Sequence, residues 1–296
     1  MTVVIALGGN ALGRGTVAEQ LATLRATCAA IAPLLAEGEI AVTHGNGPQV
    51  GNELLRQERA ADEVPPLPLY LAVAQTQAEI GALIETELAA AAGRAVACLL
   101  THVHVDADDP AFERPSKPIG PFYSADEAQA LERGRGWRLV EDAGRGFRRV
   151  VPSPEPLEIV EIDAIRALLA SGAVAVACGG GGIPVVSRNG HLKGIDAVID
   201  KDRASALLAR QLGAERLVIL TEVPAVYRHF RKSNQEEIRE LPAAEAEALL
   251  PELAEGSMRP KVEAAIELAR AGGETLITSA DALADALEGR AGTRIA

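Results

Sequence analysis

The stretch Thr2-Val-Val-Ile-Ala-Leu7, closed by Gly8-Gly9-Asn10, decides the fold. Its first six residues carry no charge, which is typical of a parallel strand buried on both faces. A glycine turn directly after such a strand lets the backbone pass close to a bound anion. The stretch therefore indicates an α/β protein with a phosphate-binding turn after its first strand.

Strand and helix patterns alternate along much of the chain. Apolar residues at helical spacing between Leu21 and Leu35 follow the first strand, and residues 40–43 form the next apolar run. Further helices are predicted at 48–61, 69–92 and 203–212, and further strands at 174–178, 217–221 and 276–278. This alternation is typical of a mainly parallel sheet covered by helices.

Composition narrows the class of protein. The 296 residues are 48% hydrophobic and 24% charged, ordinary values for a globular chain with a large core. With 29 Lys and Arg against 41 Asp and Glu, the formal net charge of −12 opposes binding to nucleic acid and to anionic membranes. A phosphate-bearing ligand must therefore be met by a local group of cations and backbone N–H groups.

Three cysteines, Cys28, Cys98 and Cys178, stand in apolar surroundings, which favours buried, reduced thiols over a disulfide framework. No basic leader segment precedes the first strand. The long uncharged stretch 167–187 is interrupted by a run of four glycines and by a proline, so it is no membrane span. We expect a cytoplasmic protein.

Residues 106–156 break the alternation and look like an insertion. They are rich in proline and glycine, and their one clear helix signal is Ser124 with Glu127, the pattern of a capping box. Six arginines crowd the second half of this segment, at positions 133, 135, 138, 145, 148 and 149. Two interpretations stay open: a solvated surface with salt bridges, or a lid over an anionic ligand.

Three glycine-rich turns each follow a predicted strand: Gly8-Gly9-Asn10, His44-Gly45-Asn46-Gly47-Pro48 and Gly179-Gly180-Gly181-Gly182. Such turns at the carboxyl ends of parallel strands form a crevice suited to phosphates. None of them matches the Walker or dinucleotide fingerprints. Together they predict a phosphate or nucleotide site of another kind.

Lysine is scarce among the 29 cationic residues, with five examples at positions 117, 193, 201, 232 and 261. A chain so biased toward arginine keeps lysine where a compact point charge is needed. Phosphoryl transfer uses lysines in this way, to position and neutralise the moving phosphate. The alternative is that these are ordinary surface lysines in a small sample.

Two features bear on metal binding. Asp202, beside Lys201, would orient that lysine or reach a metal, or it would cap the helix that starts at Arg203. His102 and His104 share one face of a predicted strand. No cysteine or carboxylate stands near the two histidines at ligand spacing, so the sequence does not predict a metal site there.

Short motifs over nearly the whole chain resemble those of carbamate kinases, members of the amino-acid kinase superfamily. The Lys117–Phe122 and Glu141–Gly146 blocks are particular to carbamate kinases within the superfamily, so the resemblance is specific. In family order the matching segments are 6–11, 43–52, 117–122, 141–146, 150–154, 178–186, 198–202 and 256–261.

The resemblance implies a single amino-acid kinase domain over residues 1–296, built as an open αβα sandwich with a mainly parallel central sheet. Residues 106–156 would form its protruding subdomain. Residues 1–190 would make the carbamate and phosphoryl side, and residues 191–296 the nucleotide side. The resemblance also implies a homodimer.

The implied reaction is reversible: ATP and carbamate give ADP and carbamoyl phosphate by in-line phosphoryl transfer, run in cells mostly toward ATP as arginine or purines are broken down. Mg²⁺ would be carried by the nucleotide phosphates, with no direct protein ligand. Two alternatives remain. One is a kinase of the same fold for another small carboxylate or phosphate, and the other is a non-catalytic sensor of nucleotide or carbamoyl phosphate.

The resemblance assigns roles to named residues. Lys201 and Lys261 would bind the transferring and nucleotide phosphates, Asp202 would organise them, and Lys117 would reach carbamoyl phosphate from the protruding subdomain. The substrate side would be lined by Gly8, Gly9, Asn10, Gly47, Gly51, Asn52, Gly179 and Gly180. The nucleotide side would be lined by Thr221, Val223, Val226, Tyr227, Met258, Pro260 and Lys261.

The chain departs from the family pattern after Leu220-Thr221. Glu222-Val223-Pro224 and the basic run Arg228–Lys232 stand where many relatives carry Asp-Val-Asp and a later glycine. These changes fall on the nucleotide side, where they bear on nucleotide affinity or base preference.

Overall fold

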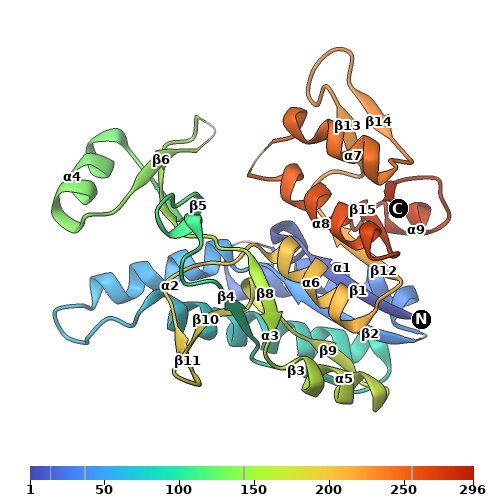
Figure 1. Cartoon of the computed structure of the whole chain (residues 1–296), viewed down its shortest axis with the longest axis horizontal. Coiled ribbons are helices and arrows are strands. Elements are labelled where there is room, and N and C mark those ends of the chain that lie inside the picture. The colour runs from blue at the N-terminus through green and yellow to red at the C-terminus, as the bar shows by residue number, and fades with distance from the viewer. Residues whose placement is uncertain (14, 37, 143, 255) are drawn as a thin grey trace.

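The helices and the other strands are arranged around one central sheet (Figure 1). The structure, a computed structural model, describes residues 1–13, 15–36, 38–142, 144–254 and 256–296, with the side chain of Asn10 left out. Within these residues the sheet has seven strands in the order β16-β15-β12-β1-β2-β9-β3. Every neighbouring pair is parallel except β15 with β16. The prediction of an α/β fold with a mainly parallel sheet is confirmed.

The opening stretch forms β1 and is buried on both faces, as its apolar sequence predicts. Val4 and Ala6 pack into one core, whereas Val3, Ile5 and Leu7 pack into the core on the opposite face. The strands of this sheet are β1 (Thr2–Leu7), β2 (Glu39–His44), β3 (Val96–Cys98), β9 (Val174–Val176), β12 (Arg216–Leu220), β15 (Glu274–Thr278) and β16 (Thr293–Ile295).

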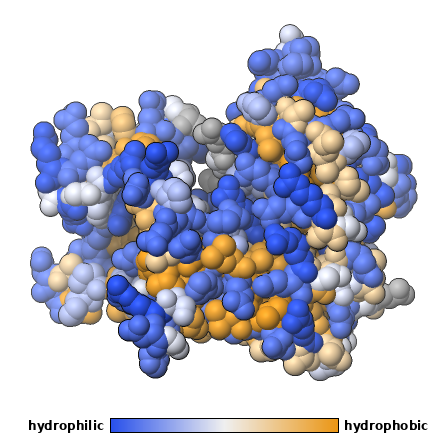
Figure 2. Space-filling view, in the orientation of Figure 1, coloured by the Kyte–Doolittle hydropathy of each residue, from blue (hydrophilic) through white to orange (hydrophobic). Residues whose placement is uncertain are grey.

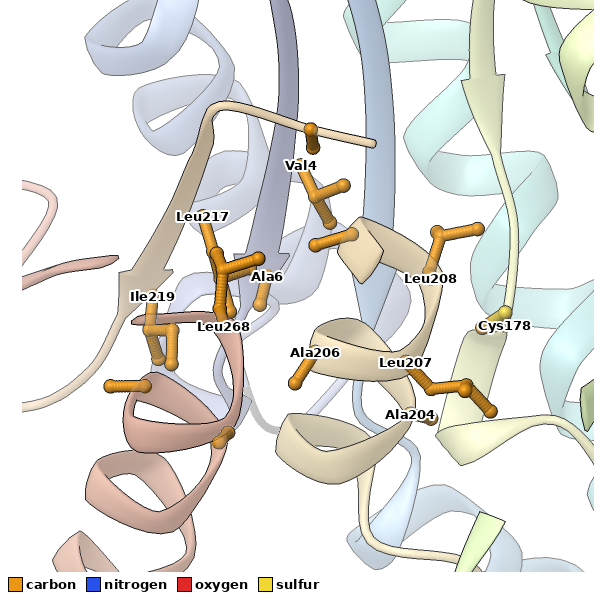
Figure 3. Close-up of a cluster of buried hydrophobic side chains, with 14 of the residues drawn as sticks. Val4, Ala6, Cys178, Ala204, Ala206, Leu207, Leu208, Leu217, Ile219 and Leu268 are labelled. Carbon is orange, nitrogen blue, oxygen red and sulfur yellow. The ribbon is translucent and has the colours of Figure 1, made fainter. Parts of the chain in front are cut away.

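Helices cover both faces of the sheet and so complete the αβα sandwich. Side chains of one helical layer share a core with Val3 and Ile5; its helices are α1 (Val17–Leu35), α3 (Leu69–Ala92) and α9 (Leu283–Leu287). Those of the other layer pack on Val4 and Ala6; its helices are α5 (Ile162–Ala170), α6 (Lys201–Leu212), α7 (Ala243–Leu249) and α8 (Met258–Arg270). Figure 3 shows α6 and α8 side chains meeting the strands in this second core.

Helix α6 starts two residues earlier than the sequence predicts. Its N-cap is Asp200, whose side chain accepts the N–H of Asp202 at 2.8 Å. The alternative in which Asp202 caps a helix from Arg203 is therefore wrong. Because the helix starts at Lys201, both Lys201 and Asp202 stand in its first turn.

A second sheet lies beside the first, in the order β11-β10-β4-β8. Its strands are β4 (His102–Val105), β8 (Pro156–Ile159), β10 (Ile183–Arg188) and β11 (His191–Gly194). A small hairpin near the C-terminal part joins β13 (Val226–Arg228) to β14 (Glu236–Ile238). Single 3₁₀ turns occur at η1 (Gly9–Ala11), η2 (Pro110–Phe112), η3 (Gly179–Gly181) and η4 (Leu250–Glu252).

Residues 106–156, the expected subdomain, run from the end of β4 to the first residue of β8. They contain a three-stranded sheet in the order β5-β7-β6, made of β5 (Lys117–Tyr123), β6 (Leu139–Glu141) and β7 (Phe147–Val151), together with α4 (Ala125–Arg135). Ser124 and Glu127 form the predicted capping box at the start of α4. In Figure 1 these elements stand away from the central sheet above α2 (Gly47–Arg59), and Figure 2 shows the surface hollowed between them and the C-terminal part.

None of the helices in the described residues combines the length and the apolar character needed to cross a membrane.

Candidate active site

The three glycine turns meet at one edge of the central sheet. Gly8, Gly45 and Gly179 follow β1, β2 and β9, which are neighbouring parallel strands. Parallel strands end at the same edge, so turns far apart in the sequence lie together in space. This edge also receives α2, whose first residue is Gly47.

A cavity of about 200 Å³ opens among these turns. The start of α6, the start of α8 and the first residues of β5 complete its wall. Of the residues singled out from the sequence, the wall contains Gly9, Gly47, Lys117, Gly180, Lys201, Asp202, Pro260 and Lys261.

Two lysines and one aspartate form the floor of the charged part of this cavity. Lys201 Nζ donates to Asp202 Oδ1, and Lys261 Nζ donates to Asp202 Oδ2 at 3.0 Å. Lys261 also donates to the Ser257 carbonyl oxygen at 3.0 Å. The Asp202 side chain is only 4% exposed, so a single buried carboxylate holds the two ammonium groups in place.

A third lysine enters from β5. Lys117 Nζ donates to Asp200 Oδ2 at 2.5 Å. Asp200 was absent from the residues predicted from the sequence, although its place before the helix start is a signal for a capping residue. It thus serves α6 as N-cap and holds the one cavity lysine contributed by residues 106–156.

Charge and burial oppose each other in this cluster. Burial lowers the pKa of Lys201 against the raising influence of Asp202. Burial acts the same way on Lys261, but the Asp202 and Asp200 carboxylates outweigh it and raise that pKa. Burial alone would raise the pKa of the Asp200 and Asp202 carboxyl groups, yet the surrounding lysines hold both pKa values below their usual range. Among the described residues that line the cavity, three ammonium groups against two carboxylates leave one positive charge, which suits an anion.

His44 lies directly under the turns and stays neutral. Its Nδ1 is 3.0 Å from the Gly45 carbonyl oxygen, which can only accept, so Nδ1 carries the proton. The imidazole is fully buried, and that burial, reinforced by the charge of Lys201, lowers its pKa to about 4. A Cβ on Gly179 would lie 2.2 Å from His44 Nε2, so the turn needs glycine there.

Buried hydrogen bonds hold the glycine turns in place. Thr43 Oγ1 and Ser205 Oγ lie 2.6 Å apart and join β2 to α6. Asn46 Nδ2 donates to Thr76 Oγ1 at 3.0 Å, and Gln77 Nε2 donates to the Gly179 carbonyl oxygen at 2.8 Å. The cavity wall is therefore fixed before any ligand arrives.

The predicted substrate residues Gly8, Gly51 and Asn52 are not among the described residues that line the cavity. Gly8 donates its N–H to the Leu220 carbonyl oxygen at 3.0 Å. Gly51 packs against Gly120, and the side chain of Asn52 is exposed on α2. Asn10 contributes the middle of η1, and its side chain lies outside the described part.

The predicted nucleotide residues outside the cavity wall are Thr221, Val223, Val226, Tyr227 and Met258. Thr221 donates its N–H to the Thr278 carbonyl oxygen at 2.8 Å, directly after β12. Val226 is fully buried, and its N–H is donated to Thr293 Oγ1 at 2.8 Å. Tyr227 packs on the Phe230 ring, with 5.9 Å between centroids. In the present arrangement, Pro260 and Lys261 are the predicted nucleotide residues that reach the cavity.

The two histidines of β4 have protein partners. His102 Nδ1 lies 2.8 Å from Glu161 Oε1, and His104 Nε2 accepts the N–H of Ser187 at 3.1 Å. Within the described residues, no three His, Cys, Asp or Glu side chains are grouped so as to hold a metal ion.

A larger surface depression of about 440 Å³ lies between α6, α7 and α8. Its described lining carries more carboxylates than guanidiniums, because Arg203 pairs with both Glu155 and Glu263, Arg270 pairs with Glu247, and Glu267 also borders it. The surplus of positive charge lies instead at the smaller cavity.

A parallel sheet whose carboxyl edge carries glycine turns and buried lysines is the arrangement of a phosphate-handling protein. The family model described as "Amino acid kinase family" matches residues 1–279. The chain belongs to the amino acid kinase family.

Carbamate kinases of other organisms match this chain over almost their whole length. The chain is 44% identical to a carbamate kinase of Staphylococcus haemolyticus, with 99% of this chain and 98% of the relative covered. It is also 44% identical to a carbamate kinase of Halobacterium salinarum, with 99% and 97% covered. A solved carbamate kinase of Giardia lamblia bound to AMP-PNP superposes with a TM-score of 0.90 at 40% identity, covering 99% and 98%. The resemblance predicted from the sequence motifs is confirmed.

Proposed function

We propose that this chain is a phosphotransferase that moves a phosphoryl group reversibly between ATP and carbamate, and that it works mainly to make ATP from ADP and carbamoyl phosphate. The observation that carries this proposal is the set of three lysines, Lys117, Lys201 and Lys261, around one small cavity. Their surplus positive charge faces a space lined by glycine turns, in a protein whose net charge is −12. The full-length similarity to carbamate kinases supports the same substrate.

The two buried lysines would bind the phosphates. Lys201 starts α6 and would neutralise the transferring group, and Lys261 in α8 would meet the nucleotide phosphates. Asp202 would keep their Nζ atoms apart and aligned. Transfer of a phosphoryl group demands positioning and charge stabilisation more than covalent chemistry, and this pre-paired cluster supplies both.

The small substrate would be met from the other wall. Lys117 would exchange its bond to Asp200 for one to carbamoyl phosphate when that ligand enters. Backbone N–H groups at the start of α2 and in the turns of Gly9 and Gly180 would bind phosphate oxygens.

Magnesium would arrive on the nucleotide. Both cavity carboxylates already accept bonds from lysines, and within the described residues the His, Cys, Asp and Glu side chains form no three-ligand group. This donor set fits a metal ion held by phosphate oxygens and water better than one caged by protein. When bound, Mg²⁺ would neutralise charge on the nucleotide phosphates.

Organisation follows from the same resemblance. Residues 1–190 would form the carbamate side, 191–296 the nucleotide side and 106–156 a protruding subdomain. The chain would work in the cytoplasm as a homodimer. An apolar surface over β8, where Leu157 and Val160 are exposed, supports a contact with a second copy (Figure 2). Sedimentation of the purified protein would report the dimer.

The experiment that tests the activity is ATP formation from ADP and carbamoyl phosphate with Mg²⁺, with acetyl phosphate as the comparison donor. We expect rapid ATP formation with carbamoyl phosphate and little with acetyl phosphate. Preference for another donor would favour a kinase of the same fold for a different small acid. Nucleotide binding without ATP formation from any donor would favour a sensor.

A further inference from the structure

Strand β5, which carries Lys117, packs against α2, and one close contact between them lies near the cavity. Gly51 of α2 meets Gly120 of β5 so closely that a Cβ on Gly51 would lie 2.1 Å from Gly120 Cα. The two backbones therefore touch, a short way along β5 from Lys117. This contact sets the distance between helix and strand, and a buried cluster of Val50, Ile119 and Val151 holds the same end of β5. The part of the subdomain beyond Gly120 lies outside this cluster and needs a further contact to prevent its rotation.

Gly120 is also the place where β5 can bend. Its φ of +76° is in the left-handed region, which glycine adopts without steric cost. The pairing of β5 with β7 runs from Lys117 to Ile119 and resumes only at Tyr123. The strand is thus irregular between the part that carries Lys117 and the part that enters the subdomain.

A second contact lies at the far end of α2. Glu58 Oε2 is 3.2 Å from an Arg135 guanidinium nitrogen, and the Glu58 side chain is 19% exposed. Arg135 lies over the Trp137 ring at 5.3 Å, and Arg149 lies over the same ring at 4.4 Å. Glu58 is therefore a carboxylate of α2 that faces a stack of two guanidiniums and an indole, and Asp196 adds a second negative charge near Arg149.

The stack is connected to Lys117 through the subdomain sheet. Arg149 pairs with Ile119 in the β5–β7 ladder, two residues beyond Lys117. Arg149, Trp137, Glu58 and Gly120 all border one narrow crevice between α2 and the subdomain. Movement of the stack away from α2 would therefore turn the ladder that holds Lys117.

We propose that Glu58 is a positioning residue for phosphoryl transfer. It holds the Arg135–Trp137–Arg149 stack against the end of α2, stops the subdomain from turning about Gly120, and so keeps Lys117 aligned in the cavity. Helix α2 makes this coupling rigid, because Gly47 and Pro48 line the cavity about three turns before Glu58. The inference rests on the proposed function, since it concerns the lysine assigned to carbamoyl phosphate.

The position of Glu58 outside the cavity predicts which kinetic constants its loss would change. It does not border the cavity, so its loss removes no contact with ligand. Misplacement of Lys117 would weaken the use of carbamoyl phosphate, whereas Lys201 and Lys261 in the core would still bind nucleotide. We expect Glu58→Gln to lower kcat/KM for carbamoyl phosphate about tenfold while the KM for ADP stays within about twofold.

The test compares four proteins in the ATP-forming assay: wild type, Glu58→Gln, the charge-swapped pair Glu58→Arg with Arg135→Glu, and Glu87→Gln. Glu87 is the matched control, because it pairs with Arg25 at 2.8 Å between α1 and α3, away from the cavity. We expect the swapped pair to recover most of the lost kcat/KM and the control to match wild type. Thermal melting of each protein reports folding.

The outcomes separate the two proposals. If wild type forms no ATP from carbamoyl phosphate, the proposed function fails. If wild type is active but Glu58→Gln changes neither substrate's parameters, or raises both KM values alike, the positioning role is overturned. Loss of activity that the swapped pair does not recover, in variants that melt like wild type, would also overturn it.

Discussion

The cavity takes its lysines from two regions built in different ways. Lys201 and Lys261 stand in the first turns of α6 and α8, helices that bury aliphatic side chains against the central sheet (Figure 3). Their side chains are 13% and 11% exposed. Lys117, in contrast, lies on an irregular strand and is 30% exposed. Lys201 and Lys261 are fixed by helices of the core, whereas Lys117 is held by β5 of the subdomain, which we call the arm.

Within the subdomain, arginine side chains stack on aromatic rings. In the subdomain, Arg135 and Arg149 stack on Trp137, and Arg145 and Arg148 stack on Phe122. Four of the six arginines in this segment therefore contact aromatic rings of the subdomain, and one of the four also pairs with Glu58. These contacts explain much of the basic cluster without a bound anion. The comparison teaches that precision at the cavity comes from core packing on one wall and from stacked side chains on the other.

The largest expected effect concerns the core wall, the side of the cavity made by Lys201, Asp202 and Lys261. Lys201→Ala should lower the rate of ATP formation about 10³-fold, because it removes a preorganised charge at the transferring phosphate. The fold should persist, since the change leaves the core helices intact. Steady-state rates and a melting curve measure both. Lys193→Ala, at an exposed position of β11, should leave the rate unchanged. Full activity of Lys201→Ala would remove this lysine from the mechanism.

The next effect tests whether the core wall depends on its carboxylate. Asp202→Asn should lower the free energy of unfolding by about 3 kcal/mol, because two buried ammonium groups lose the charge between them. Urea unfolding measures this change. Asp163→Asn, in an exposed pair with Arg166, should have no measurable effect. Equal stability of the two variants would mean that the lysines are not held by Asp202.

A third prediction concerns His44 beneath the turns. Its pKa is about 4 in the fold against an ordinary value near 6.5, so the unfolded chain binds the proton more tightly. Stability is therefore complete above pH 6.5 and is lost as pH falls from there toward 4. Between pH 7 and 4.5 wild type should lose about 2 kcal/mol more than His44→Gln, which cannot be protonated. Parallel losses in urea unfolding would contradict a buried neutral histidine.

The smallest effect separates the two regions by their local stability. Ser124→Ala removes the cap of α4 and should lower the protection of α4 amides from hydrogen exchange by about 1 kcal/mol. Amides of β1 should keep their protection. Thr16→Ala removes a matching capping box from α1, in the core layer. If Ser124→Ala weakened α4 and β1 equally, the subdomain and the core would unfold together.

Much of this arrangement could be predicted from the sequence. The uncharged β1 stretch and the alternation of strands and helices predicted the parallel sheet, and strand order then brings the three glycine turns together. The scarcity of lysine drew attention to all five lysines, and the family resemblance selected Lys117, Lys201 and Lys261, which the structure places around one cavity. Local pattern and composition carry these features because each depends on short stretches of chain.

Contacts between distant segments could not be predicted. Gly51 matched a substrate motif, yet its lack of a side chain is required by Gly120, which a single sequence does not place beside it. Asp200 was missed because its partner Lys117 lies 83 positions away. The start of α6 was misplaced by two residues because two aspartates flank Lys201 and either suits a helix cap.

The measurement that tests the two-wall account most directly is a comparison of ligand use by wild type and Lys117→Ala. The KM for carbamoyl phosphate would come from ATP formation, and the Kd for ADP with Mg²⁺ from calorimetry. The account predicts that kcat/KM for carbamoyl phosphate falls about 10²-fold while ADP binds as in wild type. Weakening of ADP binding by the same factor would show that the arm and the core do not serve separate ligands.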